Sequence, residues 1–371
     1  MTRNARLLGT RSCLAVLSTL AGCAQGTFRD SEISREHTAR KWMLIGPDLS
    51  VYDLRQGKVG TLASFARAVT DVGDFGRWWA ARVSPQGSYI ALMYDPTPAD
   101  WPEAVTSEIW IVDVRGCKAI AVDLPDDLCA SVHEMAWSPD ERSLLCFCWQ
   151  YASKYEEWRA GRLHLLARTD GGLEAPWEWQ PLPSFGTLYA DNATPVITPT
   201  SWETQHAFLI SAATEFPPPQ RARGQTRCKV IRCDLNRMQR HVLRWGLRPV
   251  SLGPGRYVYK NAVGFAPTRL VVEASCSTSQ PSERELRGNG VNMNEMPVPS
   301  PDRRYLLGAQ MWLEGHAGFA SVGGGVVAYD LCQDRYELFL KGTPSGGGPN
   351  IGVGSSVWID PIPELWRAVV P

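Results

Sequence analysis

Short apolar runs separated by turn residues fill most of the chain. "VSPQGSYIALMY" from Val83, "WSPDERSLLCFC" from Trp137 and "PSPDRRYLLGAQ" from Pro299 follow one order, in which a Ser-Pro turn leads into an apolar run. β-branched and aromatic residues in runs of about four to eight, closed by Pro, Gly, Asp or Ser, are typical of β-strands. The pattern therefore predicts an all-β protein.

The turn recurs along the chain. Weaker copies start at Ile197, Leu252 and Ile359, and neighbouring copies are separated by about 47 to 60 residues. The turn prolines are Pro85, Pro139, Pro199, Pro254, Pro301 and Pro361. A second element, an extended segment that ends in Asp and a polar turn, recurs at Asp53, Asp113, Asp234 and Asp330. Each unit therefore reads as four short strands, the pattern of a propeller blade.

These units predict a six-bladed β-propeller of four-stranded antiparallel blades over residues 41–371. The C-terminal "SSVWIDPIPELWRAVVP" is expected to give two inner strands of one blade, and "LSVYDLRQGKVGTLASF" near the N-terminus its two outer strands. Such shared closure removes free sheet edges. The alternative, a β-sandwich or a pair of Ig-like domains, lacks a regular repeat of this length.

The repeats resemble those of TolB-type, WD40-like β-propellers, whose blades read "SPDGKYIAF" followed by "IWVVDL". "SPQGSYIALMYD" followed by "SEIWIVDV" matches this pattern closely, and "SPDERSLL" and "SPDRRYLL" match it in part. The resemblance covers about half of residues 75–371. It implies the propeller fold and a protein partner in the cell envelope.

The N-terminus has the layout of a secretory signal. Three arginines precede the apolar run "CLAVLSTLA", and "LAGC" follows, ending at Cys23. This quartet resembles the lipobox of bacterial lipoproteins, which implies a signal peptide at 1–22, lipidation of Cys23 and a tether at 23–40. An ordinary signal peptide is the alternative. Ala24 in place of Asp favours the outer membrane, with the protein facing the periplasm or exposed at the cell surface.

Charge and motifs exclude several functions. The chain has 38 basic and 38 acidic residues, so nothing draws it toward nucleic acid. The Gly-rich loop 342–356 lacks the Gly-Lys-Ser/Thr ending of a phosphate-binding loop, and no Gly-x-Ser-x-Gly elbow occurs. We therefore expect a monomer without cofactor, and we assign no catalytic residue.

Setting aside Cys13 and Cys23 leaves an even number of cysteines, which favours disulfides in an oxidising compartment. Cys117 with Cys129 and Cys228 with Cys233 are close enough in sequence to pair. The sequence does not fix the pairing among Cys117, Cys129, Cys146, Cys148, Cys228, Cys233, Cys276 and Cys332. No Cys-x-x-Cys pair is present, so no metal site is predicted.

The connections between the second and third strands of the units, the b–c loops, are long and open on one face of a propeller. They are expected at 95–106, 150–161, 214–225 and 311–322, and insertions collected on one face favour binding. Their candidate binding residues are Asp100, Trp101, Glu103, Tyr155, Glu157, Trp158, Arg159, Arg221, Arg223, Trp312, Glu314 and His316. Alternatively, these aromatic side chains pack onto their own blades.

Two further features leave alternatives open. The run from Arg221 to Arg248 is strongly basic and is either a solvated outer edge or a surface for phosphates or an acidic partner. His133 and Glu134 fall on an innermost strand, where they line the channel as an acid–base pair or make structural hydrogen bonds.

The leading hypothesis is a lipid-anchored binding scaffold, and the alternative is binding or hydrolysis of a glycan or peptidoglycan fragment in the channel.

Overall fold

The structure is a computed structural model of the chain. It describes residues 43–45, 49–53, 57–70, 77–95, 108–125, 132–151, 158–169, 176–191, 195–216, 225–261, 268–273, 282–286, 297–314, 321–341 and 357–359. In some strands only the backbone is described, including the part of β21 that holds Trp312 and Glu314 and the position of His133 in β8.

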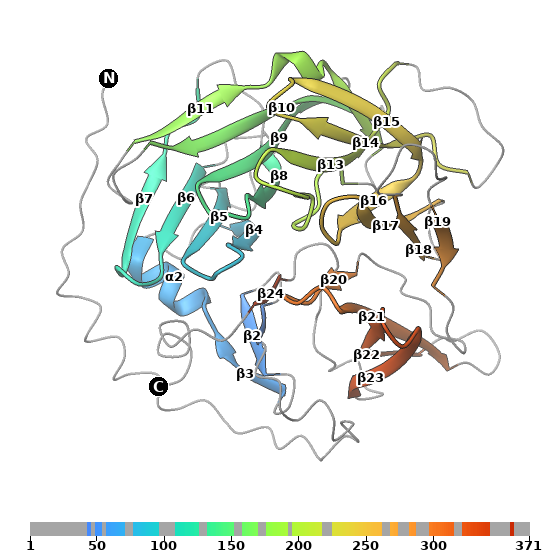
Figure 1. Cartoon of the computed structure of the whole chain (residues 1–371). Coiled ribbons are helices and arrows are strands. Elements are labelled where there is room, and N and C mark those ends of the chain that lie inside the picture. The colour runs from blue at the N-terminus through green and yellow to red at the C-terminus, as the bar shows by residue number, and fades with distance from the viewer. Residues whose placement is uncertain are drawn as a thin grey trace.

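The described strands form antiparallel sheets in a propeller arrangement (Figure 1). One sheet contains β24 (Val357–Ile359), β1 (Met43–Ile45), β2 (Ser50–Asp53) and β3 (Gly57–Thr61). The next contains β4 (Arg77–Val83), β5 (Tyr89–Asp95), β6 (Glu108–Asp113) and β7 (Lys118–Val122). A third contains β8 (Val132–Trp137), β9 (Ser143–Tyr151), β10 (Trp158–Arg168) and β11 (Trp177–Pro181), with β12 (Leu188–Asp191) paired to β10.

Three further sheets complete the described strands. They contain β13 (Ala207–Ala212), β14 (Lys229–Asp234) and β15 (Gln239–Trp245); β16 (Leu247–Ser251), β17 (Arg256–Lys260), β18 (Thr268–Val272) and β19 (Ser282–Glu285); and β20 (Val298–Pro299), β21 (Tyr305–Glu314), β22 (Ser321–Asp330) and β23 (Arg335–Lys341). The short helices are α2 (Ala63–Thr70) and η2 (Pro183–Phe185). The strands β24, β4, β8, β16 and β20 lie nearest the middle of the ring (Figure 1). Five of these sheets contain at least four described strands, the number in a complete blade.

The sheet of β13, β14 and β15 is completed by an irregular segment. The Ser211 N–H donates to the Val196 carbonyl at 2.9 Å, and the Leu209 N–H donates to the Ser201 carbonyl at 2.8 Å. Pro199, the turn proline of this unit, lies within the segment. The segment occupies the innermost place that the Ser-Pro pattern predicted for this unit.

Strands from the two ends of the chain share one sheet, as predicted, but in a different proportion. β24 pairs with β1, with Met43 opposite Ile359. The expected contribution of two strands from each end is wrong for the described residues, because the N-terminal segment supplies β1, β2 and β3. The missed strand β1 is a three-residue apolar run, too short to show a period.

The segment that follows β3 is helical, whereas the sequence pattern suggested a continuing strand. Leu62, Ala66 and Val69 are buried and recur at the spacing of one helical face. The Thr70 hydroxyl donates to the Ala66 carbonyl at 2.8 Å within the last turn. α2 thereby adds its apolar face to the cluster that contains Val51 and Ile90.

The recurring Ser-Pro turn has one hydrogen-bond pattern in its three clearest copies. Ser84, Ser138 and Ser300 each accept, through the side-chain oxygen, the N–H of the residue five positions later, at 2.9 to 3.0 Å. In two copies the hydroxyl donates to the Asp after the proline, Asp140 or Asp302. Ser138 and Ser300 thus each accept one hydrogen bond and donate another within their own turn.

The second repeated element is a capped hairpin between the third and fourth strands. The Asp113 carboxylate accepts the N–H groups of Arg115 and Gly116 at 2.9 Å, and Asp330 accepts those of Cys332 and Gln333. The residue after the Asp then donates its N–H to the Ser-Pro turn of the same sheet: Val114 to Ser88 and Leu331 to Arg304. Both repeated turns of a unit are therefore bonded together.

Four of the described cysteines are buried among apolar side chains: Cys146, Cys148, Cys228 and Cys233. Cys146 and Cys233 are free and buried, so the expected pairing of Cys233 with Cys228 is wrong. Burial raises the pKa of both thiols. The partner proposed for Cys117, Cys129, lies outside the described residues, as does Cys276.

No helix of the described part has both the length and the apolar composition needed to cross a membrane.

Replacing the turn serine is expected to destabilise the fold. In Ser138→Ala, the partly buried Ser143 N–H loses its 3.0 Å acceptor, which we expect to lower the free energy of unfolding by about 1–2 kcal/mol. Asp140→Asn keeps an acceptor oxygen and should cost under about 0.5 kcal/mol. Urea unfolding of both variants measures the difference, and equal losses would contradict the assigned role of the serine.

Candidate functional site

The predicted loop residues divide between strands and undescribed segments. Trp158 and Arg159 are the first residues of β10, and Trp312 and Glu314 lie in β21, so their assignment to loops is wrong. The hairpins are longer than the sequence pattern suggested, and the connections shrink to 152–157 and 315–320. Outside the described residues lie Cys23, Asp100, Trp101, Glu103, Tyr155, Glu157, Arg221, Arg223 and His316.

Glu134 and Arg159, which the sequence assigned to different places, meet in the structure. Glu134 is on the innermost strand β8 with 6% of its surface exposed. Its Oε2 accepts the Ile197 N–H at 2.7 Å, and its Oε1 lies 3.6 Å from Nη2 of Arg159. One carboxylate therefore connects its own sheet to the inner segment of the next sheet.

A β-bulge marks this part of β8. Val132 pairs with Cys148 and Glu134 pairs with Phe147, so His133 is the extra residue. β4 has the same irregularity between Trp78 and Ala80. In β16, the register shifts between Leu247 and Val250, where Arg248 has a φ of 52°. Bulges redirect neighbouring side chains and often lie beside binding sites. Register shifts also occur in the outer pairings of β2 with β3, β14 with β15 and β22 with β23, so a bulge by itself does not mark the site.

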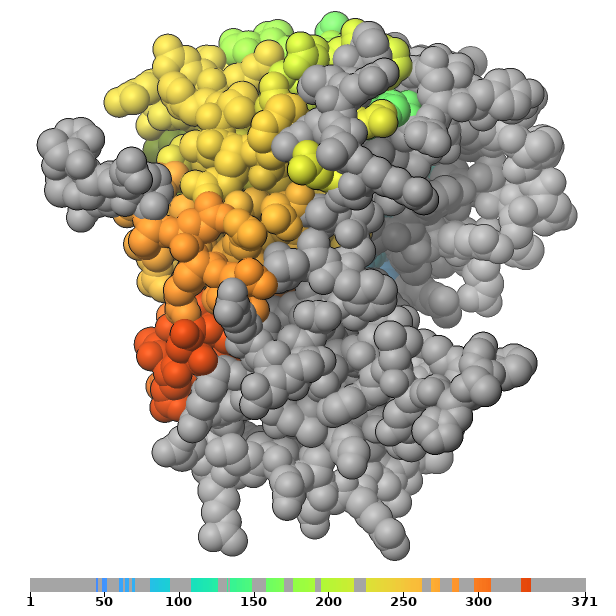
Figure 2. Space-filling model, turned by 90° about the vertical axis from the view of Figure 1, so that its right-hand side faces the viewer, coloured from blue at the N-terminus to red at the C-terminus, as the bar shows by residue number. Residues whose placement is uncertain are grey.

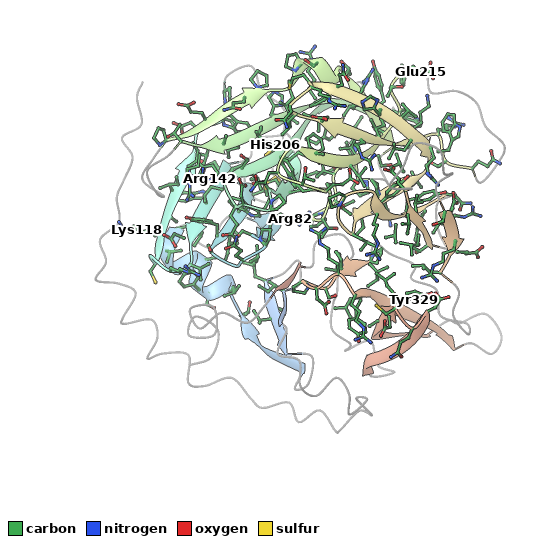
Figure 3. All side chains as sticks on the ribbon, viewed as in Figure 1. Arg82, Lys118, Arg142, His206, Glu215 and Tyr329 are labelled. Atoms are coloured by element: carbon green, nitrogen blue, oxygen red, sulfur yellow. The ribbon has the colours of Figure 1, made fainter. Side chains whose placement is uncertain are left out.

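Arg82 is the functional-site candidate that the sequence analysis missed. It lies on β4, is 7% exposed, and is located toward the middle of the ring (Figure 3). Its Nε donates to the Met135 carbonyl at 3.1 Å, and its Nη1 donates to the Ala81 carbonyl at 2.9 Å. The only sign of this site in the sequence is that an arginine stands in the strand before the first Ser-Pro turn. The next copy of the repeat has Ala136 at the equivalent position.

Burial controls the charge of this cluster. It raises the pKa of Glu134 to about 7, although the Ile197 N–H and the Arg159 charge oppose the rise. Burial also lowers the pKa of Arg82 to about 10, against the opposing effect of Glu134. Glu134 can therefore gain or lose a proton near neutral pH, while the two guanidinium groups keep the site positively charged. Such a cluster can accept a hydrogen bond or exchange a proton with a small ligand.

The basic run behaves mainly as a contact between sheets. Arg232 of β14 bridges Glu203 at 2.5 Å and Glu273 at 2.8 Å, and Arg244 of β15 pairs with Glu283 of β19. These carboxylates neutralise the inward-facing part of the run. Among the described residues, no group of three or more His, Cys, Asp or Glu side chains is placed to hold a metal ion.

Comparison with known proteins supplies a fold likeness and no family. No family model matches the chain, and no curated protein is similar to it in sequence. A putative TolB from Agrobacterium tumefaciens is similar at 12% identity over 86% of this chain and 97% of its own, with a TM-score of 0.46.

Two further solved structures are similar at the same level. A puromycin-hydrolysing peptidase from Mycobacterium tuberculosis has 13% identity over 81% of this chain and 45% of its own (TM-score 0.44). An oligogalacturonate lyase in complex with manganese has 11% identity over 71% and 66% (TM-score 0.44). At these identities no activity of those proteins extends to this chain.

The raised pKa of Glu134 predicts a specific dependence of stability on pH. Its folded pKa of about 7 lies above the ordinary value of 4.5, so the native state binds the proton more tightly than the unfolded chain. This contribution is fully present below pH 4.5 and is lost as the pH rises through 7. It amounts to up to about 3 kcal/mol.

The Glu134→Gln variant, which keeps an acceptor for the Ile197 N–H, should remove this dependence. Denaturant unfolding of both proteins between pH 4 and 8 measures it. Parallel stability curves for wild type and variant would show that Glu134 titrates at an ordinary pKa.

Proposed function

We propose that this chain is a binding module of the cell envelope, a six-bladed propeller that holds a protein partner on the face where the b–c connections emerge. Each of the six sheets is taken as one blade. The lipobox-like "LAGC" supports an anchor at Cys23, and Ala24 supports the outer membrane, facing the periplasm or the cell surface.

The observation that supports this proposal best is the contrast between the two faces. The turns at 84–88, 138–142 and 300–304 are short and are closed by their own hydrogen bonds. The connections at 96–107, 213–228 and 286–297 are longer and leave from the opposite ends of the strands. We call the face with the longer connections the elaborated face. Long loops on one face of a rigid scaffold are the usual place for binding.

Described residues at the base of the elaborated face fit a protein partner. Trp158 is half-buried at the start of β10, and Phe216, which is 49% exposed, stacks on Tyr189 at a centroid distance of 5.3 Å. Aromatic side chains with a rigid packed base are typical anchors of protein interfaces. They lie beside the segments 152–157 and 217–224.

Crosslinking in cells followed by mass spectrometry tests the scaffold proposal. We expect one envelope protein to co-purify in stoichiometric amount with the full-length chain from the membrane fraction. Replacing 96–107 and 152–157 with short Gly-Ser turns should remove it, because the elaborated face supplies the contacts. Normal recovery of the partner by this variant would contradict the proposal.

The Cys23→Ser variant tests the anchor separately. It should move the protein from the membrane fraction to the soluble fraction, because the thioether-linked lipid needs the thiol. Since the propeller is unchanged, the soluble variant should still crosslink to the partner. Continued membrane association of the variant would contradict lipidation at this position.

A second candidate function is supported by the Glu134 cluster. A carboxyl with a pKa of about 7 between Arg82 and Arg159, on the inner wall of the ring, is suited to a small polar ligand such as a glycan or peptidoglycan fragment. Titration calorimetry with muropeptides and oligosaccharides, on wild type and Glu134→Gln, discriminates the two functions. Saturable heat of binding in the wild type that is lost in Glu134→Gln supports a ligand in the channel. No saturable heat in the wild type supports the scaffold function.

A further inference from the structure

Among the described strands, β15 lies at the edge of its sheet, and its first half, Gln239–Val242, is exposed, whereas Leu243–Trp245, which begins at a bulge, is partly buried. It pairs with β14 on one side, and no described strand pairs with its other side. Gln239, Arg240, His241 and Val242 are all exposed in succession. Successive side chains in a strand point to opposite faces, so this run means that both faces of the first half of β15 are accessible. Its outward backbone groups are therefore available for pairing in the described structure.

The open half of β15 also carries exposed apolar side chains. The large hydrophobic residues exposed in the described part of the chain are Phe216, Met238 and Val242, and the last two lie on β15 and the turn that leads into it. Val242 is 51% exposed and Met238 is 37% exposed. Edge strands that face only water usually carry charged residues or proline at such positions. Here the edge offers apolar contacts beside free backbone groups.

The charge of this edge is positive and only weakly compensated. The Arg237 side chain is 73% exposed and lies 4.0 Å from Asp234, the limit of an ion pair. Arg240 donates from Nη1 to the Phe185 carbonyl at 2.6 Å and forms no ion pair with a described carboxylate. This contrasts with Arg232 and Arg244 of the same sheet, which are paired with carboxylates of neighbouring elements.

We propose that the outer edge of β15 binds an extended acidic segment of another protein, which adds to the sheet as a further strand. Main-chain hydrogen bonds would supply affinity, while Val242 and the basic side chains would select apolar and acidic residues in alternation. Antiparallel pairing of two copies of β15 would oppose basic residues to basic residues, which is unfavourable. The segment that contains β15 forms part of the exposed surface in Figure 2.

This surface is separate from the b–c face, so it does not depend on the proposed function. The test uses the full-length protein and a fluorescein-labelled nine-residue peptide that alternates glutamate and valine. We expect saturable binding by fluorescence anisotropy that weakens with added salt. The control peptide replaces the valines with proline, which keeps the charge but cannot complete a ladder.

Variants locate the site. Arg237→Glu combined with His241→Glu should weaken binding at least about tenfold through repulsion. Arg115→Glu, at an exposed position in the equivalent hairpin of the first Ser-Pro unit, is the matched control and should change affinity less than about twofold. Unchanged affinity in the double variant would overturn the proposal.

Hydrogen exchange of the wild-type protein gives an independent readout. The peptide should slow exchange of backbone amides within β15 if it adds as a strand. Equal binding of the proline peptide, which would mean attraction by charge alone, overturns the proposal. A dimer of the protein alone that protects the same amides would also overturn it, because the edge would then belong to a second copy.

Discussion

Hydrogen bonds from one innermost strand to the next hold the ring together. The Trp137 indole donates to the Arg82 carbonyl at 2.8 Å, and the Trp202 indole donates to the Ala136 carbonyl at 3.0 Å. The Thr198 hydroxyl then donates to the Pro249 carbonyl at 2.9 Å. Within one sheet, backbone hydrogen bonds join the strands to one another. Those bonds do not fix the angle between that sheet and the neighbouring sheet. These directional contacts, made at buried positions, select one packing of the sheets among the many that apolar side chains alone would permit.

Glu134 combines this structural role with an energetic conflict. Its carboxylate accepts the Ile197 N–H and thus belongs to the set of inter-sheet contacts, yet burial disfavours its charged form. An amide at the same position would make the same hydrogen bond with a smaller desolvation penalty. An ionisable group at this position, beside Arg82 and Arg159, is what the second candidate function, a small polar ligand in the channel, would use.

The sequence predicted the sheets well because their turns are local. A Ser-Pro turn and an Asp-capped hairpin are each closed by residues within five positions of one another, so their chemistry is visible in a single segment. The innermost segment near Pro199 was found for the same reason. Strand ends were less predictable: Trp158 and Arg159 pair with Asp191 and Ala190 of β12, more than 30 positions further along the chain.

The site was harder to predict than the fold. The proximity of Glu134 to Arg159 and Arg82 depends on a bulge in β8 and on the packing of adjacent sheets, neither of which a hydrophobic period reveals. The helix α2 was missed because eight residues give only two turns of helical period beside a strand-like run. The expected pairing of Cys233 with Cys228 was wrong because closeness in sequence does not decide where a side chain points: Cys233 is buried within β14, in the apolar cluster with Phe208.

The distribution of charge over the outer strands explains which surfaces remain available for partners. Arg232 and Arg244 point toward carboxylates of adjoining elements and are used in holding sheets together. Arg237 and His241 of the same basic run face solvent, next to Val242 and a free strand edge. A purely protective edge would need only the charges. The presence of an exposed β-branched residue among them, on a strand whose outer edge pairs with no described strand, makes this edge a recognition surface as well as a barrier to self-association.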